Sequence, residues 1–170
     1  MVPGAVIDLP AGLARFTVNV SWSSARVTAP EVDVVAFELG TDEKVPSDDE
    51  FVFFNQPASP DGALTLSIDG DREQGVSIDL RVVPEDVSRI TVGAAIEDKT
   101  FGELGALAVE VTTSDAGIAS AVLDAATTER SMIIAEVYRR RDVWRLRMVG
   151  QGYDDDLAGF ATRDGVEVED

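Results

Sequence analysis

The sequence predicts an all-β protein, an antiparallel β-sandwich of about ten short strands with one short C-terminal helix. Two observations carry this prediction: apolar and polar residues alternate in most segments, and turn-forming sequences separate those segments at short intervals. The alternation is clearest in "ARFTVNVSW", where one face of the extended chain carries Ala14, Phe16, Val18, Val20 and Trp22. Because successive side chains of a strand point to opposite faces, this segment is predicted to be a half-buried strand.

The remaining strands follow from the same alternation and from short β-branched runs. Alternating segments occur at 64–68, 76–82 and 106–112, and strand-like runs at 32–39, 50–54, 89–96, 118–123, 130–138 and 143–149. Turn sequences such as "QPASPDG" and "VVPED" separate them, and "RRRD" between the last two runs predicts a hairpin. Only "DDDLAGFATRDG", near the C-terminus, has a helical pattern, with three aspartates at its positive end and Gly165 as its stop.

Length and charge limit the classes of protein that this chain can belong to. It has 170 residues, 45% of them hydrophobic, so we expect one domain that spans 1–170. Its 32 acidic and 14 basic residues give a formal net charge of −18, which repels nucleic acid and attracts cations. The N-terminus has no signal-peptide pattern and no apolar run is long enough to span a membrane, so we expect a cytoplasmic protein without membrane insertion.

Histidine and cysteine are absent from the sequence. Their absence excludes a Ser-His-Asp triad, a cysteine nucleophile, a thiolate or imidazole zinc site and disulfides. No pair of carboxylates stands out as the acid and nucleophile of a glycosidase, and we therefore expect no enzymatic activity. Any metal has to bind to oxygen atoms, which favours calcium, magnesium or manganese.

The stretch "DGDREQG" at 69–75 raises the question of a cation-binding loop. It is not an EF-hand, because Gln74 and Leu80 stand where the sixth-position glycine and the twelfth-position glutamate are needed. Further carboxylates are available in "EVDVVAFEL", where Glu31 and Asp33 share the strand face of Val35, Phe37 and Leu39 and are expected at the mouth of the sandwich.

A loop at the same end would bring five carboxylates together: Glu31, Asp33, Asp69, Asp71 and Glu73. Five carboxylates so close repel one another unless a cation neutralises them, and calcium accepts six to eight oxygen ligands. The alternative is that these acids form a solvated rim of the loops.

Two further charged groups have a structural and a functional interpretation. Glu136 shares its expected face with Met132, Ile134 and Tyr138, so it is either paired in the core or an additional ligand at an edge. A basic patch is formed by Arg139, Arg140, Arg141, Arg145 and Arg147. At a net charge of −18 this patch is better explained as a hairpin tip than as a nucleic-acid surface.

Three stretches resemble the TerD family of bacterial tellurium-resistance and stress proteins: "VDVVAFELGTDEKVPSDDEFVFFNQPASPDGAL", "IDLRVVPEDVSRITV" and "AEVYRRRDVWRLRMVGQGYDDDLAGF". The resemblance covers about residues 15 to 160. It implies a single β-sandwich domain that binds calcium through acidic loops at one end and has no established enzymatic activity. It also implies other stress-response proteins as partners.

The acidic loop departs from the family pattern. Glu31 and Asp33 match the D-x-D pair of the family, with glutamate in the first place. Asp69, Asp71 and Glu73 match the end of the acidic loop, but Arg72 stands where an acid is usual and the first half of the loop is missing. The shortened loop is expected to leave one weak calcium site or none. The alternative function is a metal-independent interaction scaffold of the same fold, whose calcium sites are degenerate.

Overall fold

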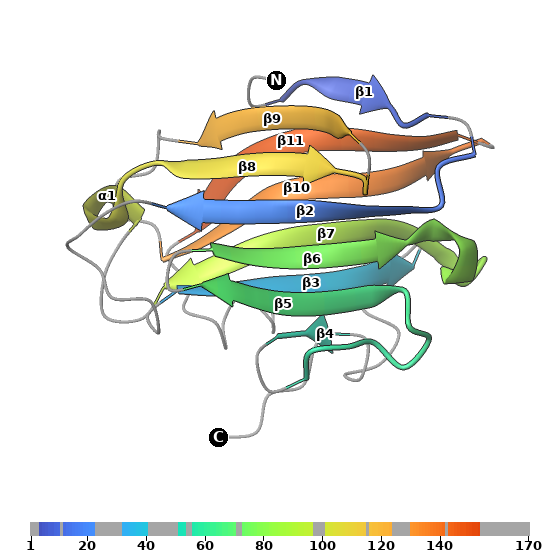
Figure 1. The fold of residues 1–170 in the computed structure, drawn as a ribbon, viewed down its shortest axis with the longest axis horizontal. Coiled ribbons are helices and arrows are strands. Elements are labelled where there is room, and N and C mark those ends of the chain that lie inside the picture. The colour runs from blue at the N-terminus through green and yellow to red at the C-terminus, as the bar shows by residue number, and fades with distance from the viewer. Residues whose placement is uncertain are drawn as a thin grey trace.

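The computed structural model describes residues 4–10, 12–22, 32–40, 51–53, 56–70, 73–96, 101–114, 116–123, 130–141 and 143–153. These residues form two antiparallel sheets that pack face to face (Figure 1). Sheet A has six strands in the order β1-β11-β10-β7-β3-β4, and sheet B has five in the order β5-β6-β2-β8-β9. The predicted β-sandwich is therefore confirmed.

The strands of sheet A are β1 (Val6–Asp8), β3 (Val32–Gly40), β4 (Phe51–Val52), β7 (Val87–Ile96), β10 (Ser131–Arg140) and β11 (Val143–Tyr153). The strands of sheet B are β2 (Arg15–Trp22), β5 (Leu64–Gly70), β6 (Glu73–Asp79), β8 (Leu107–Thr112) and β9 (Gly117–Leu123). The expected hairpin of the last two strands is present, because β10 pairs with β11 from Arg140 and Val143 onwards.

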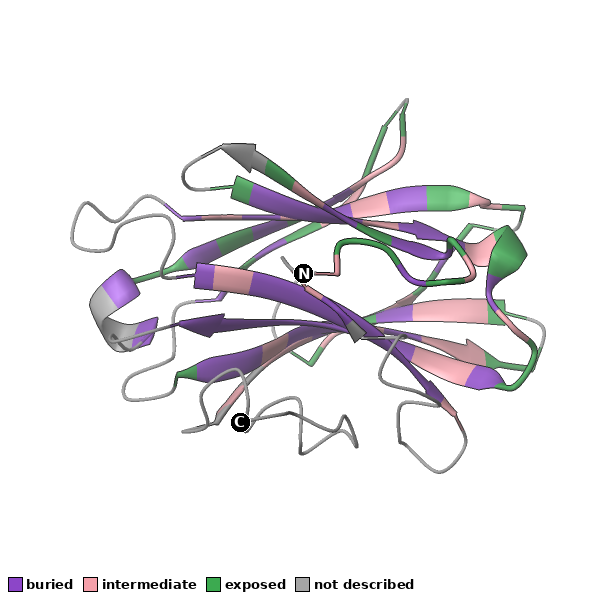
Figure 2. Ribbon diagram, turned by 90° about the horizontal axis from the view of Figure 1, so that it is seen from below, coloured by how far each residue is buried: buried purple, intermediate pink, exposed green. Residues whose placement is uncertain are grey.

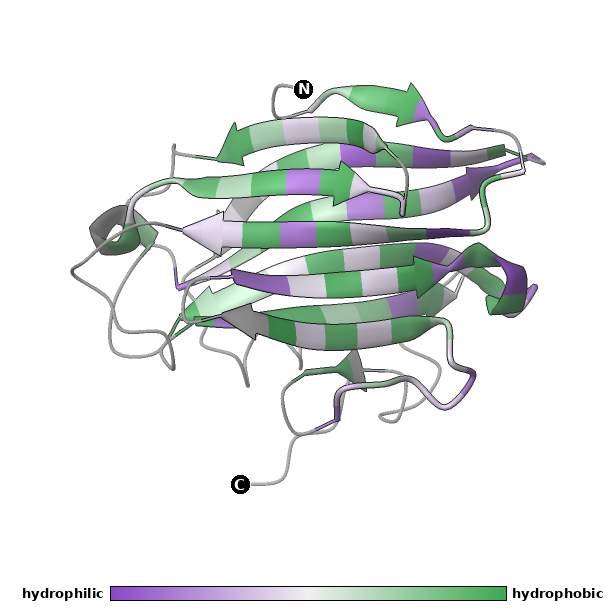
Figure 3. Ribbon diagram, viewed as in Figure 1, coloured by the Kyte–Doolittle hydropathy of each residue, from purple (hydrophilic) through white to green (hydrophobic). Residues whose placement is uncertain are grey.

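Apolar residues of both sheets form one core between them, which Figure 2 shows as buried stretches along the strands of both layers. Strand β2 illustrates the rule: Phe16, Val18, Val20 and Trp22 are at most 4% exposed, and the residues between them are not buried. Figure 3 shows the corresponding alternation of hydropathy along β2, β6 and β8. The period-two prediction holds because each of these strands has one face on the core and one outside it.

Three elements differ from the sequence-based expectations, and one of them is a short helix at Phe101–Leu104 that no helical pattern indicated. The strand expected over 76–82 ends at Asp79, and Leu80–Val82 form the 3₁₀ turn η3. The turn begins there because the Asp79 side chain accepts a hydrogen bond from the backbone N–H of Arg81 at 3.1 Å, and Val82 is consequently 44% exposed. Strand β1 pairs with β11, although its three residues were too few to show an alternation. The helix expected over 154–165 lies outside the described residues.

The two ends of the sandwich differ in charge. At the first, here called the acidic end, β3, β8 and β10 begin and β2, β7 and β9 end, as the pairing registers require. At the opposite end, here called the arginine end, lie Arg15, η3 and the turn of the β10–β11 hairpin. Among the described residues, no helix is long and apolar enough to cross a membrane.

Candidate cation site at the acidic end

Asp33 lies near the start of β3, opposite Ala95 of β7, and is partly exposed. Its neighbours Val32 and Val34 belong to the core between the sheets, so Asp33 is on the other face of sheet A. Val35, Phe37 and Leu39 share that face and are buried, but they do not belong to the core cluster between the sheets. Asp33 therefore shares the face of these buried residues as expected, but this face is the outer one of sheet A and not the one between the sheets, because β3 is buried on both faces.

Gln74 of β6 joins the start of β3 to sheet B. Its Oε1 accepts a hydrogen bond from the backbone N–H of Val34 at 3.0 Å, and its Nε2 donates to the carbonyl oxygen of Val32 at 2.9 Å. The side chain is 7% exposed, and β4 pairs with β3 only further along, at Ala36 and Phe37. The amide of Gln74 thus takes the place of a neighbouring strand at this edge, which we call the Gln74 clamp.

The local sequence pattern does not predict the Gln74 clamp, because Gln74 stands out there only as a residue in the wrong place for an EF-hand. A usable indication existed, because Gln74 has the same strand parity as Val76 and Ile78, both of which are fully buried. A polar side chain on the core face of a strand needs a hydrogen-bond partner. The partner itself could not be read from the sequence, because it is backbone of a strand 40 residues away.

The structure describes some of the five predicted calcium ligands and not others. The hairpin of β5 and β6, in which Gly70 pairs with Glu73, carries Asp69 in its first strand, and the Gln74 clamp places this hairpin next to the start of β3. Glu31 and Asp71 lie outside the described residues, as does Arg72, and the side chain of Asp69 is not described.

Asp33 and Glu73, the two predicted ligands with described side chains, do not share a face. Glu73 is exposed and precedes the inward-facing Gln74, so it is on the outer face of sheet B, whereas Asp33 is on the outer face of sheet A. Within the described part of the chain, no three carboxylates come close enough to hold a metal ion. A cluster of three or more carboxylates would therefore have to include acids beyond the described side chains, and Glu31, Asp69 and Asp71 are the predicted ones.

A short helix, α1 (Phe101–Leu104), covers the acidic end of the core. Phe101 and Leu104 are 1% and 2% exposed and join the core cluster. The following Gly105 has φ +90°, a left-handed conformation that ends the helix and turns the chain into β8. This segment therefore closes the acidic end of the sandwich with apolar side chains.

The "PASPDG" part of the motif that resembles the TerD family forms a turn. Asp61 Oδ1 accepts hydrogen bonds from the Ser59 hydroxyl at 2.6 Å and from the Ala63 N–H at 2.8 Å. Ser59 Oγ in turn accepts from the Leu64 N–H at 3.0 Å, and Gly62 adopts φ +77°. These residues fix the entry into β5, which carries Asp69 at its far end.

Glu136 is not in the core. A β-bulge between Ile133 and Ala135 inserts one residue into β10, so Met132 and Ile134 face the core while Glu136 faces outwards. The expectation that Glu136 shares the face of Met132 and Ile134 is therefore wrong, since a bulge reverses the parity beyond it. On the outer face of sheet A, Glu136 Oε1 lies 3.7 Å from Arg89 Nη1, which makes Glu136 an ion-pair partner at a distance from the acidic end.

Asp79 is a buried carboxylate whose pKa is clearly lowered. Its side chain, 7% exposed, accepts bonds from Arg81 Nε at 3.0 Å and Arg81 Nη2 at 2.9 Å, and from Arg15 Nη2 at 3.2 Å. The bonds from Arg81 hold the pKa of Asp79 well below its ordinary value despite the opposing effect of desolvation. Two arginines thus satisfy this carboxylate, and it is an anchor of η3 rather than a cation ligand.

Known proteins resemble this chain in sequence and in fold. The TerD domain model matches residues 1–163. Tellurium resistance protein TerD of Serratia marcescens is 29% identical over 167 residues, which cover 89% of this chain and 87% of that protein. General stress protein 16U of Bacillus subtilis (strain 168) is 25% identical over 189 residues, which cover 99% of this chain and 97% of that protein.

The fold is also found in a solved structure. A homologue of telluride resistance protein TerD from Streptomyces coelicolor A3(2) has a TM-score of 0.71 at 22% identity, over 88% of this chain and 96% of that one. At this identity the structural similarity shows a shared sandwich, and the family assignment rests on the match over residues 1–163. The chain belongs to the TerD domain family.

Proposed function

We propose that the chain is a cytoplasmic stress-response protein of the tellurium-resistance type that acts, without catalysis, as a calcium-binding module. The observation that carries the proposal is the Gln74 clamp, which holds the start of β3, with Asp33, against the hairpin that carries Asp69 and Glu73. Two acidic segments far apart in the sequence thereby belong to one end of the fold. The sequence relatives named for tellurium resistance and general stress support the cellular role.

Calcium is the cation that best fits the ligands this end can offer. The chain has no histidine or cysteine, so its ligands are oxygen atoms, and calcium tolerates the irregular geometry of loops. Asp69 and Asp71 would hold the ion with Glu31 assisting, and Asp33 and Glu73, which start from the outer faces of different sheets, would have to reach it over the end of the sandwich. Bound calcium supplies positive charge that relieves the repulsion between these carboxylates. Arg72 adds a fixed positive charge beside them, and we therefore expect a single weak site.

Calorimetric titration of calcium into the chelator-treated protein tests this proposal. Asp71→Asn should remove most of the binding heat, and Arg72→Asp should strengthen binding or add a second site. Asp86→Asn is the matched control, since Asp86 is an exposed acid directly before β7, roughly 33 Å along that strand from its end at Ile96. Loss of heat in Asp86→Asn equal to that in Asp71→Asn would show non-specific condensation of calcium on an acidic protein.

Fluorescence gives a second readout, because the two tryptophans lie at opposite ends of the sandwich. Trp22 ends β2 at the acidic end and is 4% exposed, whereas Trp144 lies in the β10–β11 hairpin. In a Trp144→Phe protein, the remaining emission reports on the acidic end alone. Calcium should change this emission with the same midpoint as the calorimetric titration.

The second candidate function is a metal-independent interaction scaffold. It is favoured by the placement of Asp33 and Glu73 on the outer faces of different sheets. The melting temperature, measured in calcium and in chelator, distinguishes the two candidate functions. A calcium site adds about 2.7 kcal/mol of stability at 100 times its dissociation constant, so melting temperatures in calcium and in chelator differ only if the site exists. Equal melting temperatures and no calcium heat would leave the scaffold as the function.

A further inference from the structure

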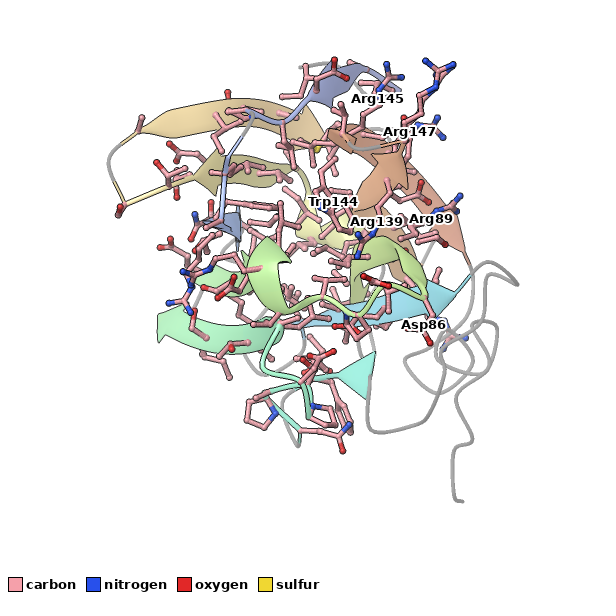
Figure 4. The ribbon with its side chains drawn as sticks, turned by 90° about the vertical axis from the view of Figure 1, so that its right-hand side faces the viewer. Asp86, Arg89, Arg139, Trp144, Arg145 and Arg147 are labelled. Atoms are coloured by element: carbon pink, nitrogen blue, oxygen red, sulfur yellow. The ribbon has the colours of Figure 1, made fainter. Side chains whose placement is uncertain are left out.

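Five arginines gather at the arginine end of sheet A, four of them on the outer face and turn of the β10–β11 hairpin and the fifth on the adjacent strand β7. We call them the arginine face: Arg89, Arg140, Arg141, Arg145 and Arg147. Tyr138 lies at the centre, because it is opposite Arg145 of β11 on one side and Arg89 of β7 on the other. Figure 4 shows Arg89, Arg145 and Arg147 on the side of sheet A that faces away from sheet B.

The charges of the arginine face are only partly neutralised. Arg145 Nε lies 2.8 Å from Asp8 Oδ1, and Arg89 pairs with Glu136. Arg147 is exposed and stands over the ring of Tyr138, 5.5 Å from its centroid. Arg140 and Arg141 are exposed and have no ion pair with any described residue. Residues 131–153 contain five arginines and two acids, so this hairpin is positive in a chain of net charge −18.

Arg139 precedes Arg140 and Arg141 in the sequence but has a structural role. Its Nε donates to the Val87 carbonyl at 3.1 Å, its Nη2 donates to the Pro84 carbonyl at 3.0 Å, and its guanidinium stacks on Trp144 at 4.4 Å from the ring centroid. These contacts hold the turn end of the hairpin against the start of β7 and the segment that precedes it. The neighbouring arginines are thus presented on a fixed support.

Arg141, in the turn of the hairpin, has a backbone conformation that is unfavourable for residues other than glycine. Arg141 has φ 58°, and it is the only described non-glycine residue with a positive φ. Two residues connect Arg140 to Val143, and such turns favour asparagine, aspartate or glycine because φ is positive there. An arginine at this position makes the folded protein less stable than a glycine would. It also presents its positive charge at the tip of the hairpin.

We propose that the arginine face is a docking site for a short acidic polypeptide segment of a partner protein. Guanidinium groups bind carboxylates through paired hydrogen bonds, and Tyr138 offers an aromatic surface between them. A short segment contacts only the hairpin, because charges beyond about 8 Å are screened at physiological salt. Nucleic acid and anionic membranes extend much further and meet the negative remainder of the molecule, which disfavours both.

Fluorescence anisotropy with a labelled peptide of about ten alternating Glu and Gly residues tests the proposal at low and high salt. The native protein should bind this peptide, and raising the salt concentration should weaken binding. Arg140→Ala and Arg147→Ala should each weaken it about two- to fivefold, as expected for exposed ion pairs. Arg15→Ala removes one exposed positive charge outside the arginine face and should leave binding unchanged.

Arg141→Gly separates a binding role from a structural one. This variant should weaken peptide binding and at the same time raise the melting temperature, because glycine adopts the left-handed conformation without strain. The proposal is overturned if the arginine-face variants bind like the native protein, if Arg15→Ala weakens binding equally, or if a Gln-Gly peptide binds as well. Tighter binding of a DNA duplex or of anionic vesicles would also overturn it in favour of those partners.

Discussion

At the scale of single residues, Gln74 connects the fold to the candidate site. Gln74→Ala leaves the Val34 N–H and the Val32 carbonyl without their partner at a buried edge, so we expect a loss of about 1–3 kcal/mol in the free energy of unfolding. Calcium binding should weaken with it. Asn19→Ala, which removes an amide from the outer face of sheet B, should cost at most about 0.5 kcal/mol. Urea denaturation measures both, and equal losses would contradict a special role for the Gln74 clamp.

Asp79 gives a prediction about pH. Its pKa is lowered in the folded protein, so its contribution to stability is complete above the ordinary aspartate pKa of about 4 and is lost as the pH falls from there towards the folded pKa. Asp79→Asn should lower stability at pH 7 by about 1 kcal/mol, because the hydrogen bonds from Arg81 and Arg15 lose their anionic acceptor. The difference from the native protein should shrink below about pH 4, and a constant difference from pH 7 to pH 2 would contradict this origin.

At the scale of elements, Arg139 fixes the β10–β11 hairpin to the segment before β7. Arg139→Ala removes donors to the carbonyls of Val83, Pro84 and Val87 and should lower the free energy of unfolding by about 1–3 kcal/mol. Hydrogen exchange should accelerate in residues 83–87. Arg139→Lys should restore only part of the stability, because an ammonium group cannot reproduce the planar fork of the guanidinium. Full rescue by lysine would show that charge alone matters at this position.

The bulge in β10 is the element for which sequence periodicity gives the wrong answer. The segment "SMIIAEVY" contains four consecutive apolar residues, 132–135, so its pattern does not tell which residue is the extra one between Ile133 and Ala135. Pairing with β7 and β11 decides where the bulge lies, and both partners are distant in the sequence. This pairing moves Glu136 from the expected core face to an ion pair with Arg89.

At the scale of the whole molecule, the net charge of −18 should make stability depend on salt. In the presence of chelator, raising sodium chloride from about 10 mM to about 1 M shortens the screening length from about 30 Å to about 3 Å and weakens repulsion among the acids. The melting temperature should therefore rise. Calorimetric melting at several salt concentrations measures the effect, and a fall in melting temperature would indicate that attractive ion pairs dominate instead.

The sequence alone determined the fold class, most of the strands, the final hairpin and the TerD family, because period-two alternation and turn residues are local properties of the chain. It also excluded histidine and cysteine chemistry by composition. The tertiary structure decided which face of β3 carries Asp33, where β10 bulges, and that Gln74 replaces a strand at the edge of sheet A. These features depend on contacts between residues distant in the sequence, and a local pattern holds no information about such partners.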